Sequence, residues 1–79
     1  MLINIEFMAS LRRPKHLERI AQIDVPERST LKQVLKLLEF DFNEIRVLQA
    51  FRSDGSRLTR KDVLKPGEKL FLTIPVGGG

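Results

Sequence analysis

Three consecutive glycines, Gly77, Gly78 and Gly79, end the sequence directly after an apolar segment at residues 70–76. Glycine has no side chain to pack in a core and loses more backbone freedom on folding than any other residue, so folding alone does not explain them. They leave an accessible carboxylate, which an extended triglycine projects about 10 Å past the last strand. We predict that the Gly79 carboxylate is the reactive group, and that Gly77 and Gly78 form a tail for a narrow channel in a partner enzyme.

A simpler interpretation of the glycines is a frayed terminus or the remnant of a flexible linker, because chain ends are commonly disordered. A linker would usually continue with serine or other polar residues. Here residues 70–76 run from a predicted strand straight into the glycines. The sequence therefore favours a tail that is anchored at its base.

The other residue types that could do chemistry form no recognisable active site. His16 is the only histidine, and the sequence places no serine partner beside it. The chain has no cysteine, which excludes disulfides, thiolate metal sites and a cysteine nucleophile. The carboxylates are scattered without metal-ligand spacing. We expect no metal, no permanently bound cofactor and no enzymatic activity of the chain's own.

Length and composition predict one small soluble domain. At 79 residues the chain has room for a single core. It has no long apolar stretch and no signal sequence, so we expect a cytoplasmic protein without a membrane partner. Fourteen basic and ten acidic side chains give a net charge of +4, which favours acidic partners. Tryptophan, tyrosine and recognised nucleic-acid motifs are absent, which argues against nucleic acid.

The densest basic stretch contains Arg12, Arg13 and Lys15. Its simplest interpretation is a solvated loop between two strands. The next alternative is electrostatic docking onto an acidic protein surface, and the last is contact with RNA.

Hydrophobic periodicity predicts a strand, a second strand and then a helix. Residues 2–8 alternate apolar and polar side chains, and residues 19–25 resume that alternation after a loop, which indicates a hairpin. Thr30 and Gln33 then form a capping-box pattern at a helix start. Apolar residues follow at helical spacing and are expected to face the core: Leu31, Val34, Leu35 and Leu38.

Three further strands are predicted after the helix. Phe42 and Ile45 are expected to close the end of the core as the chain leaves the helix. Residues 47–52 are rich in β-formers, and a Gly-containing turn at 53–56 leads to a short edge strand with Leu58. A turn with central Pro66 and Gly67 then leads into a last strand at residues 69–74.

This order, ββαβββ, predicts an α+β fold of the β-grasp (ubiquitin-like) type. We expect a mixed sheet of about four or five strands packed on one main helix, with the last strand parallel beside the first at the sheet centre. Residues 1–76 would form one domain and residues 77–79 a flexible tail.

Three segments of the chain resemble the ubiquitin-like sulfur carriers typified by the molybdopterin synthase small subunit and the thiamine-biosynthesis carrier (MoaD/ThiS-like). Phe7-Met8-Ala9-Ser10-Leu11-Arg12 is similar to that family's segment after the first strand, and residues 30–38 to its Thr-capped helix. Leu64-Lys65-Pro66-Gly67-Glu68, followed by Pro75-Val76-Gly77-Gly78-Gly79, resembles its turn, last strand and Gly-Gly end. The third glycine departs from the family's two.

The resemblance implies a function for the tail. An E1-like partner would use ATP to adenylate the terminal carboxylate, and sulfur from a persulfide would replace the adenylate to give a thiocarboxylate on Gly79. The sulfur would pass to a synthase or thiolation enzyme, in molybdopterin or thiamine biosynthesis or in tRNA thiolation. The chain would be a carrier and substrate, and it could act as the small subunit of a synthase.

The last strand also predicts where a partner would dock. If Leu70, Leu72 and Ile74 face the helix, then Phe71, Thr73 and Pro75 lie on the open face of the sheet, and Val76 follows near the base of the tail. The alternative is that Phe71 packs beneath a loop. Phe51 could join either face.

Two other classes of function are compatible with the sequence. The chain could be a ubiquitin-like modifier whose activated Gly79 is captured by a lysine amine. It could also be a β-grasp binding module with an inert tail, using the basic loop to contact RNA.

Overall fold

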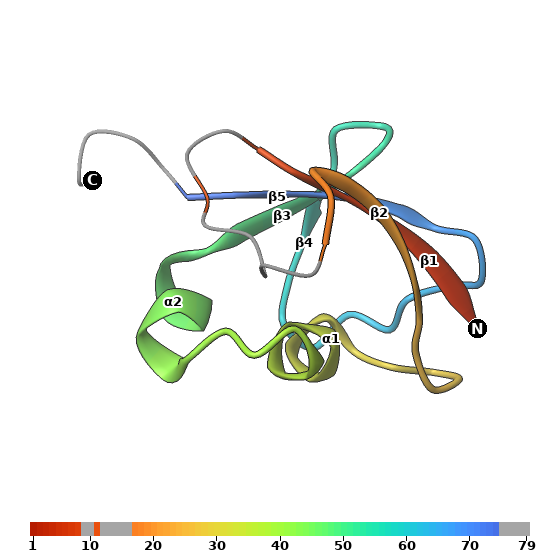
Figure 1. The fold of residues 1–79 in the computed structure, drawn as a ribbon, viewed down its shortest axis with the longest axis horizontal. Helices are drawn as coiled ribbons and strands as arrows, with labels where there is room; N and C mark the ends of the chain where they lie inside the picture. The colour runs from red at the N-terminus through yellow and green to blue at the C-terminus, as the bar shows by residue number, and fades with distance from the viewer. Residues whose placement is uncertain (9–10, 12–16, 75–79) are drawn as a thin grey trace.

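The computed structural model describes residues 1–8, 11 and 17–74 of the chain (Figure 1). Within these residues the elements follow in the order β1 (Leu2–Phe7), β2 (Ile20–Asp24), α1 (Leu31–Leu37), α2 (Phe42–Val47), β3 (Gln49–Arg52), β4 (Arg57–Leu58) and β5 (Lys69–Thr73). The predicted order of strands is confirmed, and a second short helix is added to it. No helix among these residues has the length and apolar character needed to cross a membrane.

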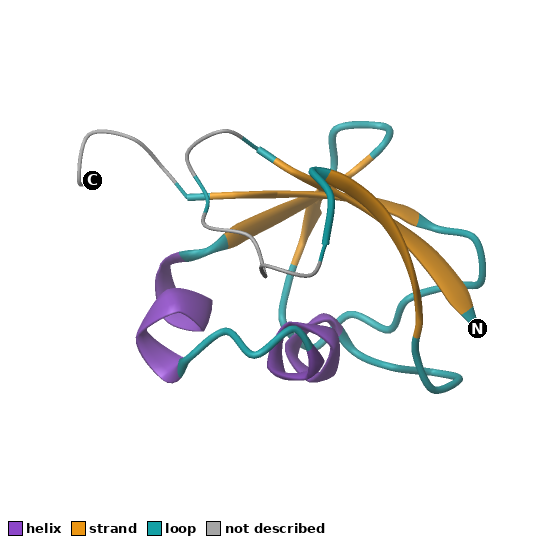
Figure 2. Ribbon diagram, viewed as in Figure 1, coloured by secondary structure: helices purple, strands orange, loops and turns teal. Residues whose placement is uncertain are grey.

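The described strands form one mixed sheet in the spatial order β2-β1-β5-β3-β4. The pairing of β1 with β5 is parallel, while β1–β2, β3–β5 and β3–β4 are antiparallel. Both helices lie on one side of the sheet, which leaves its other side uncovered by helix (Figure 2). The predicted β-grasp arrangement, with the last strand parallel beside the first at the centre, is confirmed.

The capping box at the start of α1 is present. The Gln33 amide N–H donates to Thr30 Oγ1 at 3.3 Å, and the Thr30 amide N–H donates to Gln33 Oε1 at 2.9 Å. These bonds satisfy two donors that the first turn of a helix leaves unpaired. The predicted stripe of α1 and the residue after it, Leu31, Val34, Leu35 and Leu38, faces the sheet, and none of its members is more than 4% exposed.

The short helix α2 begins with a second capping box, between Asp41 and Glu44. Ile45 is buried at 6% exposure, as expected, whereas Phe42 is 73% exposed, so its predicted place in the core is wrong. The reason is local. Asp41 starts a new helix at this point, and its first residue, Phe42, faces solvent while Ile45 turns toward the sheet.

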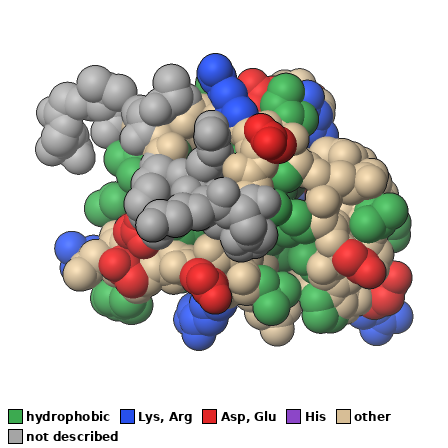
Figure 3. Space-filling view, in the orientation of Figure 1, with side chains coloured by type: hydrophobic (Ala, Val, Ile, Leu, Met, Phe, Trp, Pro, Cys, Tyr) green, Lys and Arg blue, Asp and Glu red, His purple; other side chains and the backbone are tan. Residues whose placement is uncertain are grey.

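The core lies between the helices and the inner face of the sheet. Its most deeply buried members, all at 0% exposure, are Ile3, Ile5, Val34, Leu70 and Leu72. Two of them belong to β1 and two to β5, so the central parallel pair supplies much of the interior. Charged side chains of both signs are interspersed with apolar ones on the face shown in Figure 3.

Candidate functional site

The last strand, β5, has two faces of different character. Leu70 and Leu72 are fully buried, and Ile74 packs partly buried against the core. Phe71 and Thr73 alternate with them, are half-buried and therefore lie on the open face of the sheet. The predicted alternation along this strand is confirmed.

Phe51 of β3 lies directly opposite Phe71 of β5 in the antiparallel register. Its neighbour Ala50 is 1% exposed and faces the core, so Phe51 joins Phe71 on the open face. Both rings keep part of their surface in solvent. We call Phe51 and Phe71 the aromatic patch.

The strand register continues this row across the whole sheet. Glu6 of β1 pairs with Phe71, and Arg57 of β4 pairs with Phe51. Ile20 of the edge strand β2 pairs with Glu6 and is 61% exposed. Five strands therefore present one residue each to the open face, in the order Ile20, Glu6, Phe71, Phe51 and Arg57.

Charged side chains border the aromatic patch. Lys69 Nζ lies 3.6 Å from Glu6 Oε1 and 5.1 Å from the centroid of the Phe71 ring. The second distance is within the range of a cation–π interaction. An apolar centre with a charged border is the usual composition of a protein-binding surface, so this arrangement suits docking of a partner protein.

The turn before β5 fixes where that strand begins. Glu68 accepts a hydrogen bond from Arg52 Nε at 2.7 Å, and from the Lys65 amide at 3.1 Å. The bond that Arg52 donates to the Glu68 carboxylate raises the pKa of the Arg52 guanidinium above its ordinary value. Gly67 has a φ of +76°, as expected for the predicted turn, and its N–H donates to the Leu2 carbonyl at 2.7 Å. These contacts tie the start of β5 to both neighbouring strands, β1 and β3.

Several predicted site residues lie outside the described part of the chain. These are the tail residues Gly77, Gly78 and Gly79, the docking candidates Pro75 and Val76, and the basic-loop residues Arg12, Arg13 and Lys15. Their roles stay predictions. The described chain reaches Ile74, one residue beyond β5. The chain therefore enters the tail segment from a central strand of the sheet.

Sequence reasoning missed Glu6 and Arg57 as neighbours of the patch. Only the strand register brings these residues into the row with Phe71, and register is a long-range property. Among the described residues, no group of three or more His, Cys, Asp or Glu side chains is placed to hold a metal ion.

No protein-family model and no curated protein matches this sequence. A solved structure does match the fold. The crystal structure of SAMP1 from Haloferax volcanii has a TM-score of 0.70 to this chain, covers 100% of both chains and shares 18% sequence identity. The chain has the ubiquitin-like β-grasp fold. At this identity the match concerns the fold, since a fold can carry many functions. In this β-grasp domain, the aromatic patch and the end of the central strand β5 lie close together on one sheet.

Proposed function

We propose that this chain is a sulfur carrier whose Gly79 carboxylate is adenylated by an E1-like enzyme and then converted to a thiocarboxylate. The observation that carries the proposal is a Gly-Gly-Gly sequence that begins four residues after the end of the central strand β5 of a ubiquitin-like β-grasp domain. The resemblance to the molybdopterin synthase small subunit and the thiamine-biosynthesis carrier supports it. The sulfur would serve cofactor biosynthesis of the molybdopterin or thiamine type, or tRNA thiolation.

The chemistry explains why the carboxylate must be activated. Attack of a Gly79 carboxylate oxygen on the α-phosphorus of ATP releases pyrophosphate and forms an acyl adenylate. A persulfide sulfur of a partner then attacks the acyl carbon, and AMP departs. A thiol next attacks the sulfur–sulfur bond of this adduct, which releases the thiocarboxylate and leaves a disulfide on the partner side. The product carries a nucleophilic sulfur that a carboxylate lacks.

In this proposal the chain supplies position and the partner enzymes supply catalysis. The aromatic patch would dock on the activating enzyme, and Thr73, Pro75 and Val76 would lead from that surface to the tail. Gly77 and Gly78 would pass through a channel where a Cβ atom would clash. The chain would be a substrate of the E1-like enzyme in the cytoplasm, where ATP is available, and could later form the small subunit of a synthase.

The alternative function is protein modification. The fold likeness to the ubiquitin-like protein SAMP1 favours it as much as it favours a carrier. Activation would be the same, but a lysine amine would attack the acyl carbon and form an isopeptide bond. The two functions therefore differ in the nucleophile and not in the tail.

The test is the intact mass of the protein after incubation with ATP, a sulfur donor and its host's E1-like enzyme. Replacement of one carboxyl oxygen by sulfur is expected. Heavier, lysine-linked species with an unchanged free chain would instead establish the modifier. The matched control lacks Gly78 and Gly79 and should fold normally without being activated. If neither product forms with an enzyme that is active on another carrier, the proposal is wrong.

A further inference from the structure

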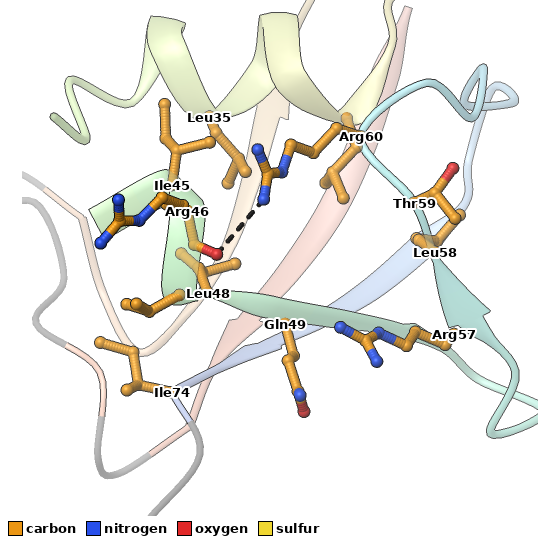
Figure 4. Close-up of a pocket in the computed structure, with 12 residues that line it drawn as sticks. Leu35, Ile45, Arg46, Leu48, Gln49, Arg57, Leu58, Thr59, Arg60 and Ile74 are labelled. Carbon is orange, nitrogen blue, oxygen red and sulfur yellow. Dashed lines mark hydrogen bonds between the residues drawn. The ribbon is translucent and has the colours of Figure 1, made fainter. Parts of the chain in front are cut away.

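A groove of about 780 Å³ opens between α2, the edge strand β4 and the end of β5. Figure 4 shows it close up. Its volume lies within the range of ordinary ligand sites. Aliphatic side chains and three arginines line it: Leu35, Ile45, Leu48 and Ile74, with Arg46, Arg57 and Arg60. Arg57 reaches the groove from the open face of the sheet. The sequence predicts none of these residues to form a site, although it assigns Leu35 and Ile45 to the core and turns Ile74 toward the helix.

Arg57 lies on β4 and Arg60 in the turn that follows it, and the two side chains are held differently. Arg60 Nη2 donates to the Arg46 carbonyl at 3.2 Å, which directs its guanidinium toward α2 across the groove (Figure 4). The Arg57 side chain extends toward Gln49 in the same view. Both arginines are exposed, and among residues 1–8, 11 and 17–74 no carboxylate forms an ion pair with either. Arg57 and Arg60 therefore bring positive charge to the groove without a described ion-pair partner.

We propose that this groove, the arginine groove, binds an acidic segment of a partner protein. An apolar side chain of that segment would enter between Leu48 and Ile74. Flanking Asp or Glu side chains would pair with Arg57 and Arg60, because a planar guanidinium matches a carboxylate with two parallel hydrogen bonds. Charge complementarity thus selects an acidic occupant, and the aliphatic floor selects one with an apolar residue.

The lining of the groove favours a peptide over nucleic acid. Proteins that bind single-stranded nucleic acid usually stack bases on aromatic side chains. The described lining of the arginine groove contains no aromatic residue. Its aliphatic floor would leave a base without a stacking partner, whereas a leucine or valine side chain would be well packed there.

The arginine groove is a second surface, separate from the row around Phe71 except that Arg57 borders both. It lies next to Ile74, so a partner bound there would sit beside the base of the tail. The inference does not depend on the chemistry of Gly79. A peptide could bind the groove whether or not the tail is ever activated.

The probe is a fluorescein-labelled peptide, Asp-Glu-Leu-Asp-Leu-Glu-Asp, titrated with the full chain and followed by anisotropy and amide chemical shifts. Saturable binding is expected, with shifts at α2, β4 and Ile74. The double variant Arg57→Glu with Arg60→Glu should weaken binding by about tenfold or more, because charge repulsion replaces attraction. The matched control, Lys32→Glu with Lys65→Glu, makes the same charge change outside the groove and should alter affinity by less than about threefold.

Single variants keep the test decisive if the double variant does not fold. Arg57→Glu alone changes an exposed side chain on a two-residue edge strand, and it should retain the native circular dichroism spectrum and lose affinity. Equal loss in the lysine control, or equal binding of a peptide with Asn and Gln in place of the acids, would overturn the proposal. So would tighter binding of a polyuridylate oligomer that is weakened by Arg57→Glu, since the groove would then be a nucleic-acid site.

One more variant separates this inference from the proposed function. The chain without residues 77–79 cannot be activated at Gly79, but it should bind the peptide with unchanged affinity. If the deletion raised the affinity for the peptide by about tenfold, the chain's own end would be shown to occupy the groove. That result would refute the proposal that the groove binds a segment of a separate partner.

Discussion

Replacing Phe71 with alanine should weaken activation more than it lowers stability. Phe71 lies at the middle of the row across the open face, opposite Phe51, and is only half-buried. Loss of an aromatic cross-strand pair costs about 0.5–1.5 kcal/mol. An aromatic residue at the centre of a docking surface contributes about 2 kcal/mol or more to binding, which corresponds to roughly thirtyfold in affinity. The variant should therefore stay folded and lose about thirtyfold in kcat/KM for adenylation.

The assay is ATP–pyrophosphate exchange by the E1-like enzyme over a range of carrier concentrations, with urea denaturation for stability. The loss should appear mainly in KM, because docking precedes the chemistry at the tail. Phe42→Ala is the matched control. It removes the same ring from α2, where Phe42 is 73% exposed, and should leave both measurements unchanged.

A double-mutant cycle with Phe51→Ala tests whether the two rings form one docking surface. The double variant should lose less than the sum of the single losses, because residues in one contact network are not independent. Two results would refute the reasoning. One is a normal KM for Phe71→Ala, and the other is an equal loss in Phe42→Ala.

Two further predictions concern the frame that holds the patch. Gly67→Ala should lower the free energy of unfolding in urea by about 1 kcal/mol. Gly67 has a φ of +76° and no atom lies within 4 Å of an added Cβ, so backbone strain is the only cost of the substitution. An unchanged midpoint of urea denaturation would contradict this. The Met1 ammonium donates to Asp24 Oδ1 at 3.1 Å, and this bond raises the pKa of the ammonium above the ordinary 8.0. The contact therefore stabilises the fold below pH 8.0, and this stabilisation is lost as the pH rises through the raised pKa. The stability difference between native protein and Asp24→Asn should therefore shrink between about pH 7 and pH 10 in denaturation measurements, and a difference that grows with pH would reverse the argument.

The parts of the fold that depend on local patterns could be predicted from the sequence. The Thr30 capping box needs only residues three positions apart, and the alternation of Leu70, Phe71 and Leu72 needs only neighbours along one strand. Asp41 and Glu44 carry the same capping signal, so α2 was visible in principle. The sequence analysis expects only a segment that leaves the first helix and closes the end of the core, so it omits α2.

The parts that depend on strand pairing could not be predicted in this way. Whether Phe51 faces the core or the open side is decided by its partner Phe71, and the place of Arg57 by its partner Phe51. The arginine groove is still harder to predict from the sequence, because it forms only when α2, β4 and β5 are packed together. The tail shows the opposite case, because the prediction that it is activated rests on the sequence of residues 70–79 and on the family resemblance, and needs no strand pairing.

The parallel pairing of β1 with β5 has a consequence for biosynthesis. Residues 1–68 lack the strand that lies between β1 and β3, and with it Leu70 and Leu72 from the middle of the core. A nascent chain can therefore close its interior only after residue 74 or so has left the ribosome, because the first strand must wait for the last. Any enzyme that requires both the folded sheet and the glycines beyond it would accept folded molecules and reject chains that stop before β5.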